Sequence, residues 1–140
     1  MNYSSELGKL SEEKAAEYLF KLGYKILGRN FKNKFGEIDI IALEKSENMN
    51  PELVIVEVRA RVIGEIQTPV DTVGNIKLRK IIRTSRALIE ELNWQYFWRI
   101  DIIGITFKKQ LTIQELKNEN NIDFEIEHIK DATYGMNIFS

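Results

Sequence analysis

Hydrophobic and polar positions along this chain follow two helical and five strand-like patterns. Apolar residues recur at helical spacing in residues 4–22 and 76–92, and Gly23 ends the first of these stretches. Shorter runs of β-branched and apolar residues, bounded by Gly, Pro or Asn, predict strands. The five predicted strands are residues 24–31, 35–44, 53–61, 98–107 and 123–130.

The order of these elements predicts an α/β fold in which helices flank a central mixed sheet of four or five strands. Residues 44–52 and 108–121 are polar and are expected to be connections. Residues 62–75 form a longer connection with two glycines and a proline. The chain has 140 residues and contains no repeat or low-complexity linker, so we expect a single domain over residues 1–140.

Two carboxylates interrupt the second and third predicted strands. Side chains alternate between the faces of a strand, so Glu57 shares a face with Ile55 and Arg59, and Asp39 shares a face with Ile41. A short connection joins these strands, so we expect them to pair as a hairpin. Asp39 and Glu57 are then expected to project from the same side of the sheet, close together.

Glu12 is a third acid that breaks the pattern of its element. At about 100° per residue it lies on the face of the first helix that carries Ala15, Ala16 and Leu19. A carboxylate that faces a core is costly unless it is paired, hydrogen-bonded or bound to a metal.

Converging carboxylates repel each other, and a hard divalent cation removes that repulsion. Oxygen ligands suit Mg²⁺ or Mn²⁺, and such an ion with bound water suits phosphoryl chemistry. A cation two residues after Glu57 lies on the same face and could stabilise a negative phosphorane. The alternative is structural: Glu57 and Arg59 form an ordinary ion pair, and Asp39 caps a turn.

Composition limits the remaining possibilities. The chain has no cysteine and one histidine, His128, which excludes disulfides, thiolate metal sites and histidine metal clusters. No basic region followed by an apolar run starts the chain, and no stretch approaches ~18 apolar residues. We therefore expect a cytoplasmic protein that does not enter membranes.

The charge is unevenly distributed, although the net charge is −1. The second predicted helix carries five basic residues and no acid over residues 77–86, and Arg79, Arg83 and Arg86 follow the spacing of one helical stripe. Such a stripe solvates a helix or follows a nucleic-acid backbone. The aromatic residues in 94–98 are expected to be core or a wedge between helix and strand, although one exposed ring could stack on an unpaired base.

Together these residues resemble a known family. Glu12, then "GEIDIIA", "VIVEVRAR", a lysine-containing helix and "RIDIIGI" are similar to the YraN-like family of predicted endonucleases. The resemblance covers about residues 8–132. It implies the restriction-endonuclease-like fold of the PD-(D/E)xK superfamily and similarity to archaeal Holliday junction resolvases.

The resemblance also implies roles for individual residues. Asp39 and Glu57, with Glu12 acting directly or through water, would hold Mg²⁺ or Mn²⁺. Arg59 stands where the superfamily motif has lysine; arginine keeps the charge but does not release a proton at neutral pH. Lys77 could replace that lysine or contact a phosphate. The other residues expected to bind nucleic acid are Arg61, Arg79 and Arg83.

The function expected from this resemblance is metal-dependent cleavage of DNA phosphodiester bonds. Branched or unusual DNA is the substrate suggested by the resolvases, which work as homodimers on two-fold symmetric junctions. Two alternatives remain open. One is a nucleic-acid-binding module with weak or no catalysis because of Arg59, and the other is a protein-interaction domain whose acids are structural.

Overall fold

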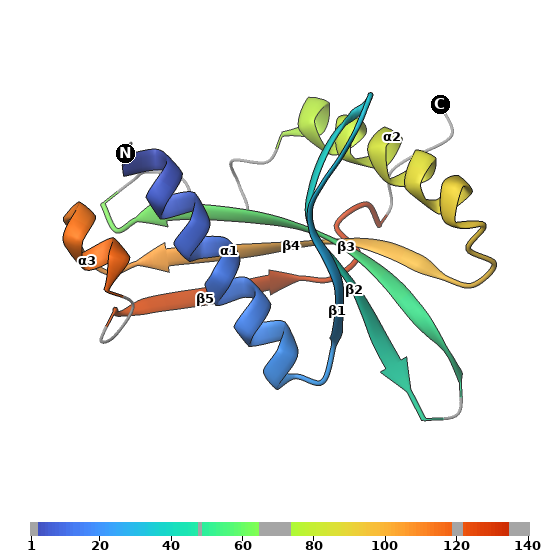
Figure 1. The fold of residues 1–140 in the computed structure, drawn as a ribbon, viewed down its shortest axis with the longest axis horizontal. Coiled ribbons are helices and arrows are strands. Elements are labelled where there is room, and N and C mark those ends of the chain that lie inside the picture. Colours follow the sequence, from blue (N-terminus) through green and yellow to red (C-terminus); the bar gives the residue numbers. More distant parts are fainter. Residues whose placement is uncertain (1–2, 48, 65–73, 119–121, 135–140) are drawn as a thin grey trace.

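The computed structural model describes residues 3–47, 49–64, 74–118 and 122–134. These residues form a five-stranded open sheet flanked by helices, as Figure 1 shows. The elements in chain order are α1 (Tyr3–Lys21), β1 (Lys25–Asn33), β2 (Gly36–Ser46), β3 (Met49–Val62), α2 (Asn75–Leu92), β4 (Trp98–Phe107), α3 (Ile113–Lys117) and β5 (Phe124–Ile129).

The strands lie in sequence order across the sheet, β1-β2-β3-β4-β5. β1, β2 and β3 form an antiparallel meander, β3 and β4 are parallel, and β4 and β5 are antiparallel. A parallel pair needs a crossover, and α2 lies in the connection between β3 and β4. The predicted mixed sheet is therefore confirmed, with five strands.

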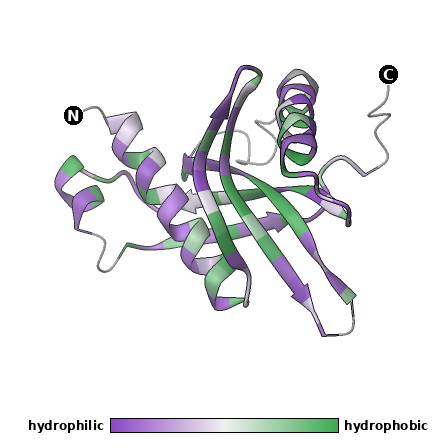
Figure 2. Cartoon of the chain, turned by 45° about the vertical axis from the view of Figure 1, so that its right-hand side comes forward, coloured by the Kyte–Doolittle hydropathy of each residue, from purple (hydrophilic) through white to green (hydrophobic). Residues whose placement is uncertain are grey.

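Two hydrophobic clusters lie on opposite faces of this sheet. Under α1, the alternate β3 residues Val54 and Val56 pack with Leu19 of the helix. Under α2, Leu53 and Ile55 pack with Ile81 of that helix. Figure 2 shows the hydrophobic colour concentrated along the strands where the helices cover them. None of the described helices is long and apolar enough to cross a membrane.

Two expected connections contain regular structure. Residues 44–52 were expected to be a polar loop, but β2 continues to Ser46 and β3 begins at Met49. Pro51 is tolerated there because β4 begins pairing only at Leu53, so this part of β3 is an edge without a second ladder. The polar stretch 108–121 contains α3, which Thr112 and Glu115 begin with a capping box. Most of the predicted connection 62–75 lies outside the described residues.

Candidate functional site

The candidate site lies where β2 and β3 separate. Their ladder runs from Glu44 opposite Glu52 to Ile40 opposite Val56, so Asp39 and Glu57 would form the next pair. The Asp39 carboxylate instead accepts a hydrogen bond from the Val58 backbone N–H, at 2.7 Å from Oδ2. A side chain therefore takes the place of a backbone partner, and the two strands diverge beyond it.

A local twist of β2 directs Asp39 toward this gap. Ile38 packs in the cluster under α2, whereas Ile40, two residues later, packs in the cluster under α1. In a regular strand both residues would share a face, so β2 rotates at Asp39. On β1, the register places Asn30 opposite Asp39, and Asn30 has a left-handed φ of 53°. Asparagine tolerates this conformation better than most residues do.

Glu57 is the buried acid of the pair, with 7% of its surface exposed. Its Oε1 lies 3.1 Å from Arg59 Nη2 and 3.6 Å from Lys77 Nζ. Burial, and then the nearby Asp39 charge, raise the pKa of Glu57 to about 7 despite these two cations. Desolvation and a second carboxylate thus outweigh the two positive charges.

Glu12, on α1, interacts with Asp39. Burial and the charge of Asp39 raise the pKa of Glu12, and a hydrogen bond from the Asn30 side chain opposes this shift. Asp39 therefore interacts with Glu57 and, separately, with Glu12. Of the three acids predicted from the sequence, Asp39 is the one that the other two share as a neighbour.

A cavity of about 530 Å³ opens beside Asp39 and Glu57, between the β1–β2 hairpin and α2. Its lining combines three acids with four lysines. The lining residues are Lys32, Asn33, Lys34, Phe35, Gly36, Glu37, Asp39, Glu57, Lys77, Lys80, Ile81 and Thr84. Glu12 and Arg59 line a separate cavity of about 260 Å³ against α1.

The other basic residues predicted to bind nucleic acid lie outside the lining of the larger cavity. Arg79 and Arg83 are exposed on α2, and Lys80, on the same helix, lines the cavity in their place. Arg61 is half-buried on β3, four residues beyond Glu57. Of this predicted set, Lys77 alone borders the cavity.

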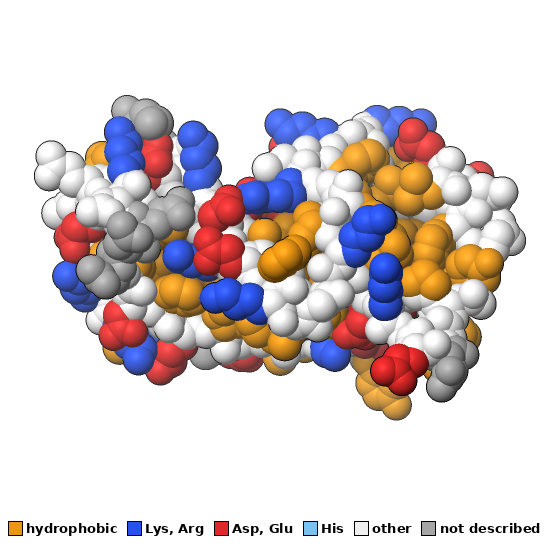
Figure 3. All heavy atoms as spheres, turned by 60° about the horizontal axis from the view of Figure 1, so that its bottom comes forward, with side chains coloured by type: hydrophobic (Ala, Val, Ile, Leu, Met, Phe, Trp, Pro, Cys, Tyr) orange, Lys and Arg blue, Asp and Glu red, His pale blue; other side chains and the backbone are white. Residues whose placement is uncertain are grey.

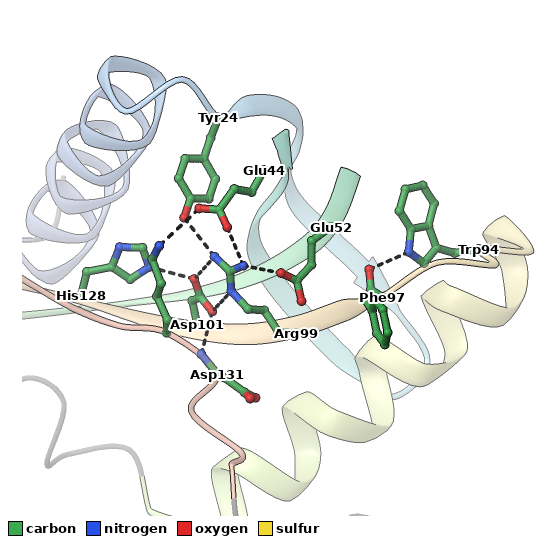
Figure 4. Close-up of polar contacts among 10 residues, drawn as sticks. Tyr24, Glu44, Glu52, Trp94, Phe97, Arg99, Asp101, His128 and Asp131 are labelled. Carbon is green, nitrogen blue, oxygen red and sulfur yellow. Dashed lines mark hydrogen bonds and ion pairs between the residues drawn. The ribbon is translucent and has the colours of Figure 1, made fainter. Parts of the chain in front are cut away.

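The same two strands carry a second pair of facing acids, Glu44 and Glu52, five residues from the first pair on each strand. Arg99 lies between them: its Nη1 is 2.8 Å from Glu44 Oε1 and 2.7 Å from Glu52 Oε1 (Figure 4). Burial favours the neutral acid, but hydrogen bonds from Arg99 and Tyr24 lower the pKa of Glu44 to about 2.

The guanidinium of Arg99 is satisfied on every side. It also donates to Asp101 through Nε at 2.9 Å and to the Tyr24 hydroxyl at 2.9 Å. Asp101 is fully buried, and its carboxylate also contacts His128 Nε2 at 2.8 Å and accepts from the Asp131 backbone N–H at 3.0 Å. Arg99, Asp101 and His128 therefore belong to one buried cluster of structural contacts.

The two acid pairs therefore differ in how completely their charge is neutralised. Glu44 and Glu52 share a buried arginine, and Glu44 is held ionised. Glu57 holds its proton up to about pH 7, although Arg59 and Lys77 lie close to it. Perturbed carboxyls in clefts occur frequently at functional sites. The Asp39–Glu57 pair is consequently the better candidate for binding a cation.

The donor atoms of this site suit a hard cation. Within the part of the chain that the structure describes, no group of three or more His, Cys, Asp and Glu side chains is arranged to hold a metal ion. Mg²⁺ often uses only one or two protein carboxylates and keeps several waters. Asp39 and Glu57 fit that requirement, and Glu12 would then act through water or through its contact with Asp39.

The aromatic segment after α2 is divided between core and surface. Trp94 and Trp98 pack against the cluster under α2, as expected, whereas Tyr96 and Phe97 are 49% and 76% exposed. In Figure 3 hydrophobic side chains gather toward the right-hand end of the molecule, the end at which α2 connects to β4 in Figure 1. These rings lie outside the lining of the cavity beside Asp39.

Several residues of the site were not found from the sequence. Lys32, Lys34 and Lys80 were not among the predicted site residues, because nothing in the strand or helix pattern indicates that they share a cavity. Asn30 and Asn33 were overlooked as well, although an asparagine inside or at the end of a predicted strand often marks an irregular backbone position.

Comparisons with known proteins give a matching family model and relatives of similar length. A family model described as "Uncharacterised protein family UPF0102" matches residues 11–105. A UPF0102 protein of Chlorobium chlorochromatii is 37% identical over 131 residues, which cover 94% of this chain and 93% of the relative. A UPF0102 protein of Thermodesulfovibrio yellowstonii is 40% identical over 129 residues, covering 92% and 96% respectively.

Proposed function

The chain belongs to the family UPF0102, and we propose that it is a metal-dependent nuclease that hydrolyses DNA phosphodiester bonds. The observation that carries this proposal is the incompletely neutralised acid pair Asp39–Glu57 beside a lysine-lined cavity. Glu57 resists ionisation although two cations lie beside it, so a further cation would stabilise its ionised form. The lysines on the same cavity suit a polyanionic substrate.

In the proposed mechanism Asp39 and ionised Glu57 would hold Mg²⁺ or Mn²⁺, which would supply polarisation of the phosphate and a bound water of lowered pKa. Arg59 stays charged and stabilises the negative charge that develops on the phosphorane. Lys77, whose Nζ lies 3.6 Å from Glu57 Oε1, would contact a phosphate oxygen beside the two acids. Glu12 would orient Asp39.

The restriction-endonuclease-like fold is part of the same proposal. The acids on α1, β2 and β3 match the order of the superfamily motif, and the mixed five-stranded sheet between helices is compatible with it. Branched DNA, as cut by the resolvases, is the preferred substrate on this view. A two-fold symmetric junction would then be bound by a homodimer, and Arg61, Arg79 and Arg83 would contact the backbone beyond the cavity.

One alternative has a specific observation in its favour. Arg59 cannot replace the proton-transfer role of a lysine, and its Nε is buried with no hydrogen-bond partner among the described residues. A DNA-binding module with little or no cleavage would retain every other feature of the site. A protein-interaction domain with structural acids would lack salt-sensitive DNA binding altogether.

A cleavage assay separates these functions. Single-stranded, duplex, flapped and four-way DNA would be incubated with the native chain in Mg²⁺, Mn²⁺ or EDTA, beside Asp39→Ala and Glu57→Ala. Cleavage that needs the metal and is lost in both variants is expected. Glu44→Ala, which removes an acid from the structural pair on the same strands, is the matched control and should still cleave once its stability is verified. Cleavage that survives Asp39→Ala would contradict the assignment.

A further inference from the structure

The turn between β1 and β2 is fastened to α2. The Asn33 side chain donates from Nδ2 to the Thr84 carbonyl at 3.2 Å, and its Oδ1 accepts from the backbone N–H groups of Phe35 and Gly36 at 2.9 and 3.3 Å. A Cβ added at Gly36 would lie 2.9 Å from the Thr84 hydroxyl. Figures 1 and 2 both show the tip of this hairpin beside α2. The far wall of the cavity is therefore held in a defined position.

The four lysines that line this cavity are not equivalent. Lys32 pairs with Glu37 at 3.4 Å, and Lys77 pairs with Glu57 at 3.6 Å. Lys34 and Lys80 form no ion pair with any acid in the described ranges, although both line the same cavity. The Nζ atom of Lys34 lies over the ring of Phe35, 5.1 Å from its centroid, which favours one placement of this ammonium group.

The acidic and the unpaired basic side chains of this cavity therefore come from different parts of the fold. Asp39 and Glu57 belong to the sheet, and the unpaired ammonium groups belong to two other elements, Lys34 to the hairpin tip and Lys80 to α2. A ligand with one negative group would need only one of these lysines. Two lysines on different elements, with a cation-binding pair of acids beside them, suit a chain of several negative groups.

We propose that the hairpin tip and α2 form a clamp for one polynucleotide strand, in which Lys34 and Lys80 bind the phosphates on either side of the phosphate at Asp39 and Glu57. This inference rests on the proposed function, because it takes the acid pair to be the place of cleavage. The occupant of the cavity is then a single polynucleotide strand. The arginines Arg79 and Arg83, which lie outside the lining, have no part in the clamp.

The test uses a thymidine tetranucleotide, which is short enough to occupy little more than the cavity, in EDTA so that it is not cleaved. Its dissociation constant would be measured by NMR titration at several salt concentrations. Each phosphate contact on a long single strand contributes about 0.7 to the slope of log K against log salt, and a tetranucleotide, which condenses fewer counterions, gives a smaller value. We expect Lys34→Ala with Lys80→Ala to lower that slope by up to about 1.4, and each single substitution to lower it by about half as much.

A double variant with the same change in charge is the control. Lys21→Ala with Lys25→Ala removes exposed lysines near the junction of α1 and β1, away from the cavity lining. It should leave the slope for the tetranucleotide unchanged. An unchanged slope in the Lys34 and Lys80 variants, or an equal fall in the control, overturns the clamp.

Failure of the clamp and failure of the proposed nuclease give different results. If the native chain cleaves long DNA with Mg²⁺ but the lysine substitutions leave the slope unchanged, the clamp is wrong and the nuclease assignment stands. If the slope falls as expected but no DNA is cleaved, the cavity binds a strand without cutting it. If the native chain does not bind the tetranucleotide at low salt, the clamp is wrong.

Discussion

Glu57→Gln tests the central physical claim, that the Asp39–Glu57 pair is incompletely neutralised. The pKa of Glu57 is about 7 in the folded chain, against an ordinary value of 4.5. Between these values the folded chain binds a proton that the unfolded chain has released, so the free energy of unfolding falls as pH rises. The difference between the two pKa values corresponds to about 3 kcal/mol.

The assay is urea unfolding in EDTA at several pH values between 4.5 and 8. Relative to Glu57→Gln, the native chain should lose about 3 kcal/mol of unfolding free energy over this range. Glutamine cannot ionise, so the variant lacks the pH-dependent part of the unfolding free energy that comes from Glu57. Addition of Mg²⁺ at pH 8 should raise the unfolding free energy of the native chain and leave that of Glu57→Gln nearly unchanged, because a ligand stabilises only the state that binds it.

Glu44→Gln is the matched control for this measurement, because it makes the same chemical change on the neighbouring strand. The pKa of Glu44 is lowered to about 2. Its ionisation therefore contributes fully to the free energy of unfolding above the ordinary glutamate pKa, and this contribution is lost only as the pH falls below that ordinary value. The difference between the native chain and Glu44→Gln should therefore stay constant from pH 5 to 8. If the difference for Glu57→Gln is also constant over this range, Glu57 ionises normally and the reasoning is refuted.

Three further substitutions test other parts of the structure. Gly36→Ala should lower the free energy of unfolding by about 2 kcal/mol, because the added Cβ would meet Thr84 of α2. Gly28→Ala, which has open space around it, should change that free energy by less than about 0.5 kcal/mol. Equal losses in urea unfolding would contradict the close approach of Gly36 to α2. Arg99→Met should cost about 3 kcal/mol by the same assay, because Asp101 would stay buried without its cation, and a neutral result would mean that this cation is dispensable. Arg59→Lys should raise the rate of metal-dependent DNA cleavage by about 10²-fold, since lysine can transfer a proton; an unchanged single-turnover rate would show that position 59 acts only through its charge.

Much of the fold could be predicted from local patterns. Alternation along β3 correctly separated Val54 and Val56 from Leu53 and Ile55, and the short connection correctly predicted that β2 and β3 pair. The same reasoning brought Asp39 and Glu57 together, because facing residues of an antiparallel pair share a side of the sheet. Glu12 followed from helical spacing in the same way.

The remainder depends on contacts between distant segments, which local patterns do not report. Two walls of the cavity are joined by the hydrogen bond from Asn33 to Thr84, 51 residues away. Nothing in the local sequence around Lys34 or Lys80 indicates that the two residues border one space. The contacts of Arg99 with Glu44 and Glu52 likewise join β4 to residues 44–52, which were expected to be a loop.

The Arg99 cluster draws on every part of the sheet. Its members come from β2, β3, β4 and β5 through Glu44, Glu52, Asp101 and His128, and Tyr24 directly precedes β1. Separation of one strand there would expose a buried charge, so this end should open only when the whole domain unfolds. Amide hydrogen exchange around Arg99 should therefore be governed by global unfolding, while amides beyond Asp39, where β2 and β3 have parted, exchange through smaller fluctuations. The sheet thus combines a cooperative end that carries stability with an end where β2 and β3 part around Asp39 and Glu57.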